Sequence, residues 1–211
     1  MTSLVLASAS PRRQALVRLL GVSWRTAPAA IDEARYVLPD PFVGALHVAA
    51  AKARAIQPAS GEVIVAADTL VVADGEPLGK PADAAQARAM LRQLRGRLHV
   101  VVTGVALRTA RDQWWGGVVS TLVAVRDYTD PEIEAYVERG EPFDKAGGYA
   151  IQDTPFRPVE HVDGCYLNVV GLPLCTVAAG LATLGTDVDR PVTMAPPCGY
   201  CRSGAKLVAI G

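Results

Sequence analysis

One carboxylate in this chain lies where a carboxylate is costly to bury. Asp68 and Thr69 separate two strand-like apolar runs, residues 63–67 and 70–73. No Gly or Pro adjoins Asp68 and no helical pattern follows it, so we expect neither a turn residue nor a helix cap. An acid in such a segment must be paired, hydrogen-bonded or bound to a metal. Two interpretations stay open: a structural ion pair with Lys80, which a turn expected at Asp74 and Gly75 brings back toward the strand, or a catalytic or metal-binding carboxylate.

A helix start near the N-terminus has the composition of an anion site. Residues 8–13 read SASPRR, with Ser10 as the expected N-cap and Pro11 as the first helical residue. Arg12 and Arg13 fall beside the positive end of the helix dipole, which is unfavourable by a few tenths to about 1 kcal/mol each. Backbone N–H groups, serine hydroxyls and two guanidinium groups at one point suit a phosphate. The alternative is that both arginines extend into solvent or pair with distant acids.

A wider set of charged residues has the composition of a site for a polyphosphate and a hard cation. Carboxylates suit Mg²⁺ or Mn²⁺, while lysines and arginines neutralise phosphate oxygens. Each residue also has an ordinary structural role open to it, and spacing alone does not show that they converge. The set comprises Glu33, Lys52, Asp68, Lys80, Asp144 and Lys145.

Competing types of site lack their motifs. No GxGxxG follows the first expected strand and no GxxxxGK[ST] occurs, so neither a dinucleotide fold nor a P-loop NTPase is supported. A Ser-His-Asp hydrolase is poorly supported because GxSxG is absent. We expect His47, His99 and His161 to be ordinary core or surface residues.

Composition limits the partners of this chain. Its 211 residues fit one domain or two small lobes, and its formal net charge of zero predicts no broad surface for nucleic acid or an acidic membrane. The longest apolar run, residues 169–184, is interrupted by Gly171, Pro173 and Gly180 and is not a convincing membrane span. The N-terminal charges follow a short apolar run, the reverse of a signal peptide. We expect a soluble, cytoplasmic protein.

The cysteines favour no metal or redox centre. Cys165 and Cys175 lie in apolar segments and are expected to be core residues. Cys198 and Cys201 form one CxxC after two prolines, without the second ligand pair of a zinc site or the strand–helix context of a redox motif. We therefore expect a domain over residues 1–185, followed by a loosely attached Pro- and Gly-containing tail over residues 186–211.

Alternating strand and helix patterns must position these residues. Two long β-rich segments joined by a short polar connection predict an antiparallel hairpin, so the α/β fold has a mixed sheet. A capping box at residues 129–132 opens one helix, and residues 27–40 are expected to form a loop. Strands are expected at residues 4–7, 22–26, 63–67, 70–73, 98–110, 114–125, 156–162 and 166–170. Helices, with their caps, are expected at residues 10–21, 41–56, 83–96, 129–140 and 172–184.

Several motifs occur in one fixed order along the chain. They are LASASPRR (6–13), KARA (52–55), AADTLVV (66–72), GKPAD (79–83), ML–L–G–H-V-V-TGVAL (90–107), EPFDKAGGYAIQ (141–152) and VVGLPL (169–174). In these motifs and their order the chain resembles the Maf family of nucleoside triphosphate pyrophosphatases, also called septum formation inhibitor Maf-like proteins. The resemblance covers residues 3–184 and excludes the tail.

The resemblance implies a fold, a reaction and a partner. The fold is of the Maf/inosine-triphosphatase-like kind, an elongated mixed sheet flanked by helices with a cleft between two lobes. The reaction is hydrolysis of a nucleoside triphosphate to the monophosphate and pyrophosphate with a divalent cation, Mg²⁺ or Mn²⁺, and the assembly is a homodimer. The rival hypothesis is a nucleotide-binding regulator of septation or cell division with little turnover. The intact acid and lysines favour the enzyme, because a pure binder does not need the acid.

The resemblance also implies roles for single residues. Asp68 matches the family's proton acceptor, and Glu33 matches an acid that would be a second metal ligand. An ordinary aspartate is a weak base for water, so we expect Asp68 to orient a water whose acidity bound metal raises. Basic positions would hold the triphosphate and offset developing charge, and serines would complete the phosphate cradle. These positions are Lys52, Lys80, Arg12, Arg13, Ser8 and Ser10.

Three residues match positions tied to the choice of base: Arg12, Thr69 and Gln152. The Asp-Thr and Ile-Gln pairs resemble the branch that acts on dTTP and UTP. A glutamine amide offers a donor and an acceptor together, which matches the O4 and N3–H edge of uracil or thymine. This branch usually reads AGAYGIQG, whereas residues 146–153 read AGGYAIQD. The moved glycine and Asp153 lie beside the expected base pocket, so they bear on base preference more than on reaction class.

Overall fold

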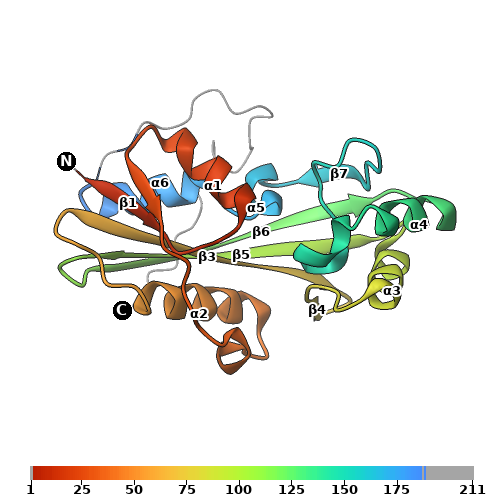
Figure 1. Cartoon of the computed structure of the whole chain (residues 1–211), viewed down its shortest axis with the longest axis horizontal. Helices are drawn as coiled ribbons and strands as arrows, with labels where there is room; N and C mark the ends of the chain where they lie inside the picture. The colour runs from red at the N-terminus through yellow and green to blue at the C-terminus, as the bar shows by residue number, and fades with distance from the viewer. Residues whose placement is uncertain (1, 187, 189–211) are drawn as a thin grey trace.

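A single long mixed sheet runs through the molecule (Figure 1). The computed structural model describes residues 2–186 and 188. The strands are β1 (Ser3–Leu6), β2 (Trp24–Thr26), β3 (Glu62–Ala73), β4 (Glu76–Leu78), β5 (Leu98–Thr109), β6 (Trp114–Val125) and β7 (Val159–Asp163). Their order is β2-β1-β3-β5-β6-β7, and β4 pairs with β3 off this path. β1 is parallel to β2 and β3, and the other pairs are antiparallel.

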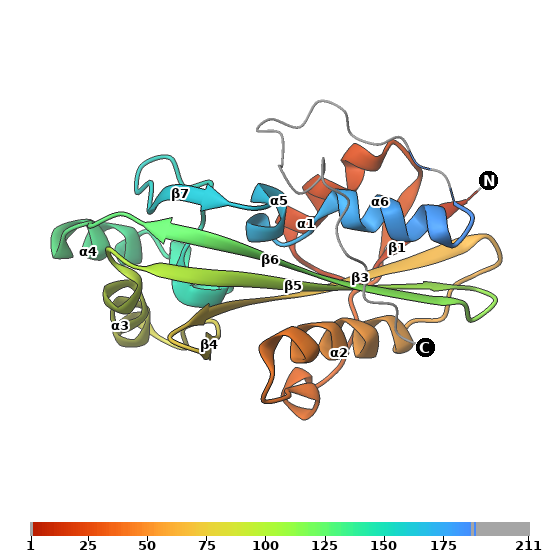
Figure 2. The same cartoon turned by 180° about the vertical axis from the view of Figure 1, so that it is seen from behind.

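Helices cover both faces of the sheet. The α-helices are α1 (Pro11–Val17), α2 (Pro41–Arg54), α3 (Ala84–Leu94), α4 (Asp130–Glu138), α5 (Tyr166–Val170) and α6 (Leu174–Thr183). Short 3₁₀ helices are η1 (Arg18–Leu20), η2 (Glu33–Tyr36), η3 (Glu141–Asp144) and η4 (Ala146–Gly148). α1, α5 and α6 lie on one face and α2 on the other, while α3 and α4 lie at the far end of the long strands (Figures 1 and 2). The predicted α/β fold, with a mixed sheet flanked by helices, is confirmed.

Successive side chains of β3 enter different layers of the protein. The odd-numbered residues from 63 to 67 pack with α1 and α6, whereas Ile64 and Ala66 pack with α2. Because side chains alternate along a strand, Asp68 emerges on the α2 face and Thr69 on the α1 face. The two apolar runs predicted here are in fact one strand of 12 residues, since pairing with β5 continues through Asp68 and Thr69.

One edge of β3 is open in its middle. β1 pairs with residues 62–65 and β4 with residues 71–73. Among the described residues, no strand pairs with residues 66–70 on that side. β4 returns to this edge through the predicted turn at Asp74 and Gly75, whose φ angles of 52° and 84° suit a type I′ hairpin. The opening gives a ligand access to both faces of the strand.

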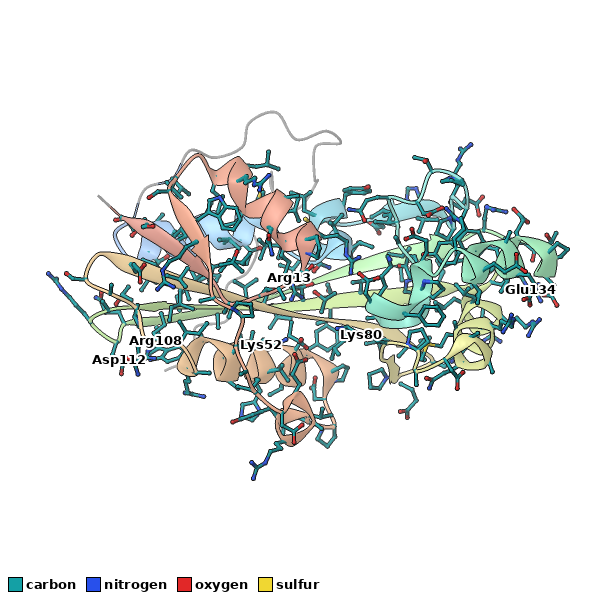
Figure 3. All side chains as sticks on the ribbon, viewed as in Figure 1. Arg13, Lys52, Lys80, Arg108, Asp112 and Glu134 are labelled. Carbon is teal, nitrogen blue, oxygen red and sulfur yellow. The ribbon has the colours of Figure 1, made fainter. Side chains whose placement is uncertain are left out.

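α2 packs on β5 at backbone distance. A Cβ atom at Gly104 would lie 2.4 Å from the carbonyl carbon of Ala45, so only a glycine allows this contact. Arg108 of β5 donates to two carbonyl groups at the C-terminal end of the helix, at 3.5 and 3.4 Å. Both contacts hold α2, which carries Lys52, against the sheet (Figure 3).

Two predicted elements are wrong. Residues 166–170 form helix α5 and not a strand, and Asn168 of this helix is fully buried with its amide hydrogen-bonded to β5 and β6. A five-residue apolar run has no period that separates the two structures. The expected loop at residues 27–40 contains η2, which begins where the Asp32 carboxylate accepts from the N–H of Ala34 at 3.3 Å.

Other predicted elements are confirmed with shifted ends. β5 and β6 form the antiparallel hairpin, and both bonds of the capping box at Thr129 and Glu132 are present. The first helix is α-helical only to Val17 and continues as η1 before Gly21, whose φ is 68°. The last helix begins at Leu174, because Pro173 occupies its N-cap.

Sequence features near the C-terminus are described only in part. Cys165 is buried, as expected, and Cys175 is partly buried. The tail predicted from residue 186 onward, with Cys198 and Cys201, lies outside the described residues apart from Thr186 and residue 188. The division into a domain and a tail therefore stays a prediction. In the described ranges, no helix has both the length and the apolar composition needed to cross a membrane.

A buried histidine makes folding sensitive to acid. His99 Nε2 lies 2.7 Å from the Tyr149 hydroxyl, and burial lowers the pKa of His99 to about 4. The folded pKa is below the unfolded value, so stability is complete above the unfolded pKa and falls as protons bind the unfolded chain. Between about pH 6.5 and pH 4 we expect a loss of about 3 kcal/mol in the free energy of unfolding.

Urea unfolding across this pH range tests that expectation. His99→Gln, which does not titrate, should flatten the pH dependence, whereas the exposed control His161→Gln should leave it unchanged. An equally steep loss of stability in His99→Gln would show that other groups cause it.

Candidate active site

A cavity of about 660 Å³ opens at the unpaired middle of β3. Its walls come from both ends of the molecule: α1, α2 and η2 on one side, and the segment around η3 and η4 on the other. The predicted site residues come together in space, which their spacing in the sequence did not show. Every one of them lines this cavity. They are Ser8, Ser10, Arg12, Arg13, Glu33, Lys52, Asp68, Thr69, Lys80 and Gln152.

A buried ion pair lies on the α2 face of β3. Asp68 Oδ1 accepts from Lys52 Nζ at 2.8 Å, and the two residues are 8% and 7% exposed. Lys52 Nζ also lies 3.0 Å from Glu33 Oε1, whose side chain is 56% exposed. Of the two interpretations left open by the sequence, the structural ion pair of Asp68 with Lys80 is excluded, because α2 brings Lys52 to the carboxylate instead.

The two predicted metal ligands meet at one ammonium group. Asp68 and Glu33 both contact Lys52 Nζ, so one cation already lies within reach of both carboxylates. Within the described residues, no group of three or more His, Cys, Asp or Glu side chains could hold a metal. Mg²⁺ commonly takes one or two carboxylates and completes its shell with water and phosphate oxygens. The donors fit a hard cation bound jointly with a phosphate.

Arg13 is held on the opposite face of β3 (Figure 3). Its Nε donates to the Gly171 carbonyl at 2.8 Å, and its Nη2 donates to Thr69 Oγ1 at 3.0 Å. Nη1 donates to Ser8 Oγ at 3.4 Å. Burial lowers the pKa of Arg13, and the charges of Asp68 and Glu33 act against that shift. An arginine fixed by its neighbours presents its charge to a ligand without first losing side-chain freedom.

Arg12 spans the mouth of the cavity. Its Nη1 lies 2.9 Å from Asp144 Oδ2, and its Nη2 donates to the Asp144 carbonyl at 3.2 Å. Burial acts to raise the pKa of Asp144, but contacts with Lys145 and Arg12 outweigh it and the pKa lies below its ordinary value. The alternative that an arginine pairs with a distant acid therefore holds for Arg12, while Arg13 contacts neutral groups.

Lys80 follows β4 on the same rim. It is exposed, and none of the ion pairs among the described residues includes it. Figure 3 shows it beyond Lys52 along the sheet. A cation that lines the cavity and forms no ion pair with the residues that the structure describes is available to a ligand anion.

The end of the cavity near η4 is mostly apolar. Val71, Val101, Tyr149 and Val169 contribute to its lining, and the exposed Gln152 lies at its edge. Gly147 has a φ of 67°, and a Cβ atom there would lie 2.9 Å from Val71. Close packing of η4 on β3 thus shapes this end, which suits a planar base better than a phosphate.

Asp153, one of the two departures from the resembling motif, lies outside the cavity lining. Its side chain is 7% exposed, and Oδ1 accepts from Arg139 Nη2 at 2.8 Å and from the Phe156 N–H at 2.7 Å. The residue holds its own loop and places no charge at the base end.

Sequence reasoning missed one group in the cavity wall and two behind it. The Gly171 carbonyl holds Arg13, and Thr103 and Asn168 lie behind Thr69. All three fall in or beside quoted motifs, but an apolar motif gives no sign that its backbone carbonyl holds a guanidinium.

Comparisons with known proteins find relatives that match most of this chain. The family model described as Maf-like protein matches residues 3–184. A dTTP/UTP pyrophosphatase of Thermomicrobium roseum is 49% identical over 206 residues, covering 94% of this chain and 93% of that one. The proteins of the same name from Moorella thermoacetica and Anaeromyxobacter dehalogenans strain 2CP-C are 46% and 50% identical, covering 89% and 86% of this chain and 98% and 94% of theirs.

A more distant likeness exists among solved structures. A HAM1 protein from Coxiella burnetii has a TM-score of 0.42 at 19% identity, covering 61% of this chain and 75% of that one. It is a partial likeness. The match of the family model over most of the chain and the identity to these relatives are decisive, and the chain belongs to the Maf-like protein family.

Proposed function

We propose that this chain is a nucleoside triphosphate pyrophosphatase that hydrolyses dTTP and UTP to the monophosphate and pyrophosphate. The observation that carries the proposal is the buried Asp68–Lys52 pair in a cavity whose walls also carry Arg12, Arg13 and Lys80. A buried acid beside several cations suits attack on a bound polyphosphate. The names of the relatives, dTTP/UTP pyrophosphatase, support the same reaction.

The reaction adds water across the anhydride bond between the α- and β-phosphates. One P–O bond forms to the water oxygen and one breaks to release pyrophosphate. Asp68 orients the water and accepts its proton; Oδ1 accepts from Lys52, which leaves Oδ2 for the water. Lys52 keeps the carboxylate in one rotamer, so the attacking water is held in place before the reaction.

The cations of the cavity bind the triphosphate and offset its charge. Arg13 is already fixed, and Lys80 faces the cavity without an ion pair among the described residues. Arg12 exchanges Asp144 for a phosphate oxygen when the substrate binds. Ser8 and Ser10 lie at the helix start, where they complete the phosphate site. These groups are worth most when the leaving pyrophosphate gains charge.

We infer that Mg²⁺ or Mn²⁺ binds to Asp68 and Glu33 together with phosphate oxygens. When bound, such an ion makes water more acidic and withdraws charge from the phosphate. Removal of divalent ions with EDTA should therefore stop pyrophosphate release, and excess Mg²⁺ or Mn²⁺ should restore it. Full activity in EDTA would show that Lys52 and the arginines suffice.

A panel of nucleotides tests the proposal directly. Pyrophosphate release is measured from dTTP, UTP, CTP, ATP and GTP with Mg²⁺ or Mn²⁺, and dTTP and UTP should be preferred. The rival from another class is a nucleotide-binding regulator of cell division. Binding of nucleotides without release of pyrophosphate from any of them would favour that regulator.

Gln152 is proposed to read the base edge. Its amide offers one donor and one acceptor, and it lies at the apolar end of the cavity. Gln152→Ala should change the order of preference among the nucleotides, lowering kcat/KM for dTTP and UTP by about tenfold more than for CTP. A matched control is Gln86→Ala, on α3 outside the cavity lining. An equal loss for every nucleotide would contradict base reading.

Two implications of the resemblance stay predictions. The homodimer is tested by sedimentation of the purified chain, and the cytoplasmic location by fractionation of cells. Neither bears on the reaction proposed for the cavity.

A further inference from the structure

A series of hydrogen-bonded polar groups runs from the wall of the cavity into the protein behind it. Arg13 Nη2 donates to Thr69 Oγ1 at 3.0 Å. Thr69 Oγ1 lies 2.9 Å from Oγ1 of Thr103, its register partner on β5. Thr103 Oγ1 donates to the carbonyl oxygen of Asn168 at 3.2 Å. Thr103 and Asn168 are both 0% exposed, so water does not reach the inner end.

Both ends of this hydrogen-bonded series have a fixed role, because one end can only donate and the other can only accept. A guanidinium group only donates and a carbonyl oxygen only accepts, while a hydroxyl has one hydrogen and two lone pairs. Thr103 gives its hydrogen to Asn168, so the hydrogen between the two hydroxyls comes from Thr69. Thr69 has then donated its hydrogen, and Arg13 uses one of its lone pairs. One lone pair remains for a ligand.

The opposite direction of the hydrogen bond between the two threonine hydroxyls is costly. If Thr103 donated to Thr69, the buried carbonyl of Asn168 would lose the side-chain partner that the structure gives it. The Thr69 hydrogen would then point to the Gly171 carbonyl at 3.5 Å, a long contact to an oxygen that already accepts from Arg13 at 2.8 Å. Both lone pairs of Thr69 would be taken by Arg13 and Thr103, so this arrangement would leave no acceptor for a ligand.

The inner end of the hydrogen-bonded series, at Asn168, is also fixed in position. The Asn168 amide nitrogen donates to the Val101 carbonyl and to Thr121 Oγ1, both at 2.9 Å. These bonds anchor α5 to β5 and β6, so the carbonyl that accepts from Thr103 does not shift easily. The direction of these hydrogen bonds is therefore set by the fold and is in place before a ligand arrives.

We propose that Thr103 and the Asn168 carbonyl make Thr69 an acceptor toward the base, so that Thr69 selects a ring N–H. This inference rests on the proposed function and deepens it. N3 of uracil and thymine carries one hydrogen. Thr69 accepts it, and the Gln152 amide then serves the base by donating to O4, whereas N3 of cytosine is itself an acceptor. Cytosine against Thr69 would bring two acceptors together, which is unfavourable. Thr103 is thus a positioning residue for the choice of pyrimidine, although it does not touch the substrate.

The test removes only the inner hydroxyl. Thr103→Val keeps the shape of the side chain and frees the Thr69 hydrogen, which then rotates toward the base. The ratio of kcat/KM for UTP over CTP should fall by about tenfold. Thr103→Ser keeps the hydroxyl and should keep the ratio. A merely structural role would lower both rates together and leave the ratio unchanged, and that result in a folded Thr103→Val would overturn the proposal.

A second measurement uses the unaltered protein. N3-methyluridine triphosphate keeps O2 and O4 but lacks the ring hydrogen, so its kcat/KM should drop to that of CTP or below. Turnover at the rate of UTP would overturn the proposal even if Thr103→Val fails to fold. If the protein releases no pyrophosphate from any nucleotide, the proposed function fails. In that event the dissociation constants of UTP, CTP and N3-methyluridine triphosphate, measured by calorimetry, still decide this inference.

Discussion

Asp68→Asn should lower the rate of pyrophosphate release by about 10²- to 10⁴-fold, the usual contribution of a positioned acid or base. Asparagine has nearly the same shape but accepts no proton and carries no charge. Lys52 keeps its second partner, Glu33, at 3.0 Å, so its ammonium group is not left alone. Nucleotide affinity should therefore be largely retained. Single-turnover kinetics and calorimetry on the same sample separate the two effects.

The matched control is Asp144→Asn, the same chemical change in the same cavity. Asp144 lies at the mouth and pairs with Arg12, so its loss should change KM more than kcat. A near-normal rate in Asp68→Asn, with a lower melting temperature, would make Asp68 a structural partner of Lys52. That outcome would restore the first of the two interpretations open at the level of sequence, with Lys52 in the place of Lys80.

Gly104→Ala should damage stability and activity together. The new Cβ atom would lie 2.4 Å from the backbone of Ala45, so α2 must move away from β5. Overpacking of this kind costs about 1–3 kcal/mol in the free energy of unfolding. Because α2 carries Lys52, the move also lengthens the 2.8 Å contact with Asp68. Urea unfolding and kcat/KM at a temperature where the variant is folded measure both effects.

Gly180→Ala is the control for this prediction. A Cβ atom there would lie 2.5 Å from the ring of Trp115, on the face of the sheet opposite to α2. We expect a similar loss of stability with kcat/KM unchanged. If Gly104→Ala loses stability but keeps full activity, the position of α2 does not control the Asp68–Lys52 pair.

Sequence reasoning succeeded where one local pattern decides the outcome. The hairpin between β5 and β6, the Asp74–Gly75 turn and the capping box at Thr129 each depend on a few adjacent residues. The buried acid was found because Asp68 interrupts an apolar strand, which is a local signal as well. The residue-by-residue assignments of the cavity came from the resemblance and not from spacing.

Prediction from the sequence fails where the outcome depends on packing between distant segments. Lys80 is nearer to Asp68 in sequence, but Lys52 is the partner because Gly104 lets α2 approach the sheet. Residues 166–170 are helical because Asn168 finds partners on two strands more than forty residues away. No single-sequence pattern contains either contact.

The open edge of β3 allows two neighbouring residues to face different parts of a bound nucleotide. Asp68 and Thr69 are consecutive residues, yet they face opposite sides of the sheet, and a ligand reaches both only because β1 and β4 leave residues 66–70 uncovered. On the proposed roles, the acid that orients the attacking water lies in one layer of packed side chains, and the threonine that reads the base lies in the other. If these roles hold, substitutions around Thr69 and Thr103 would change the preferred base while the pair of Asp68 and Lys52 keeps the same chemistry.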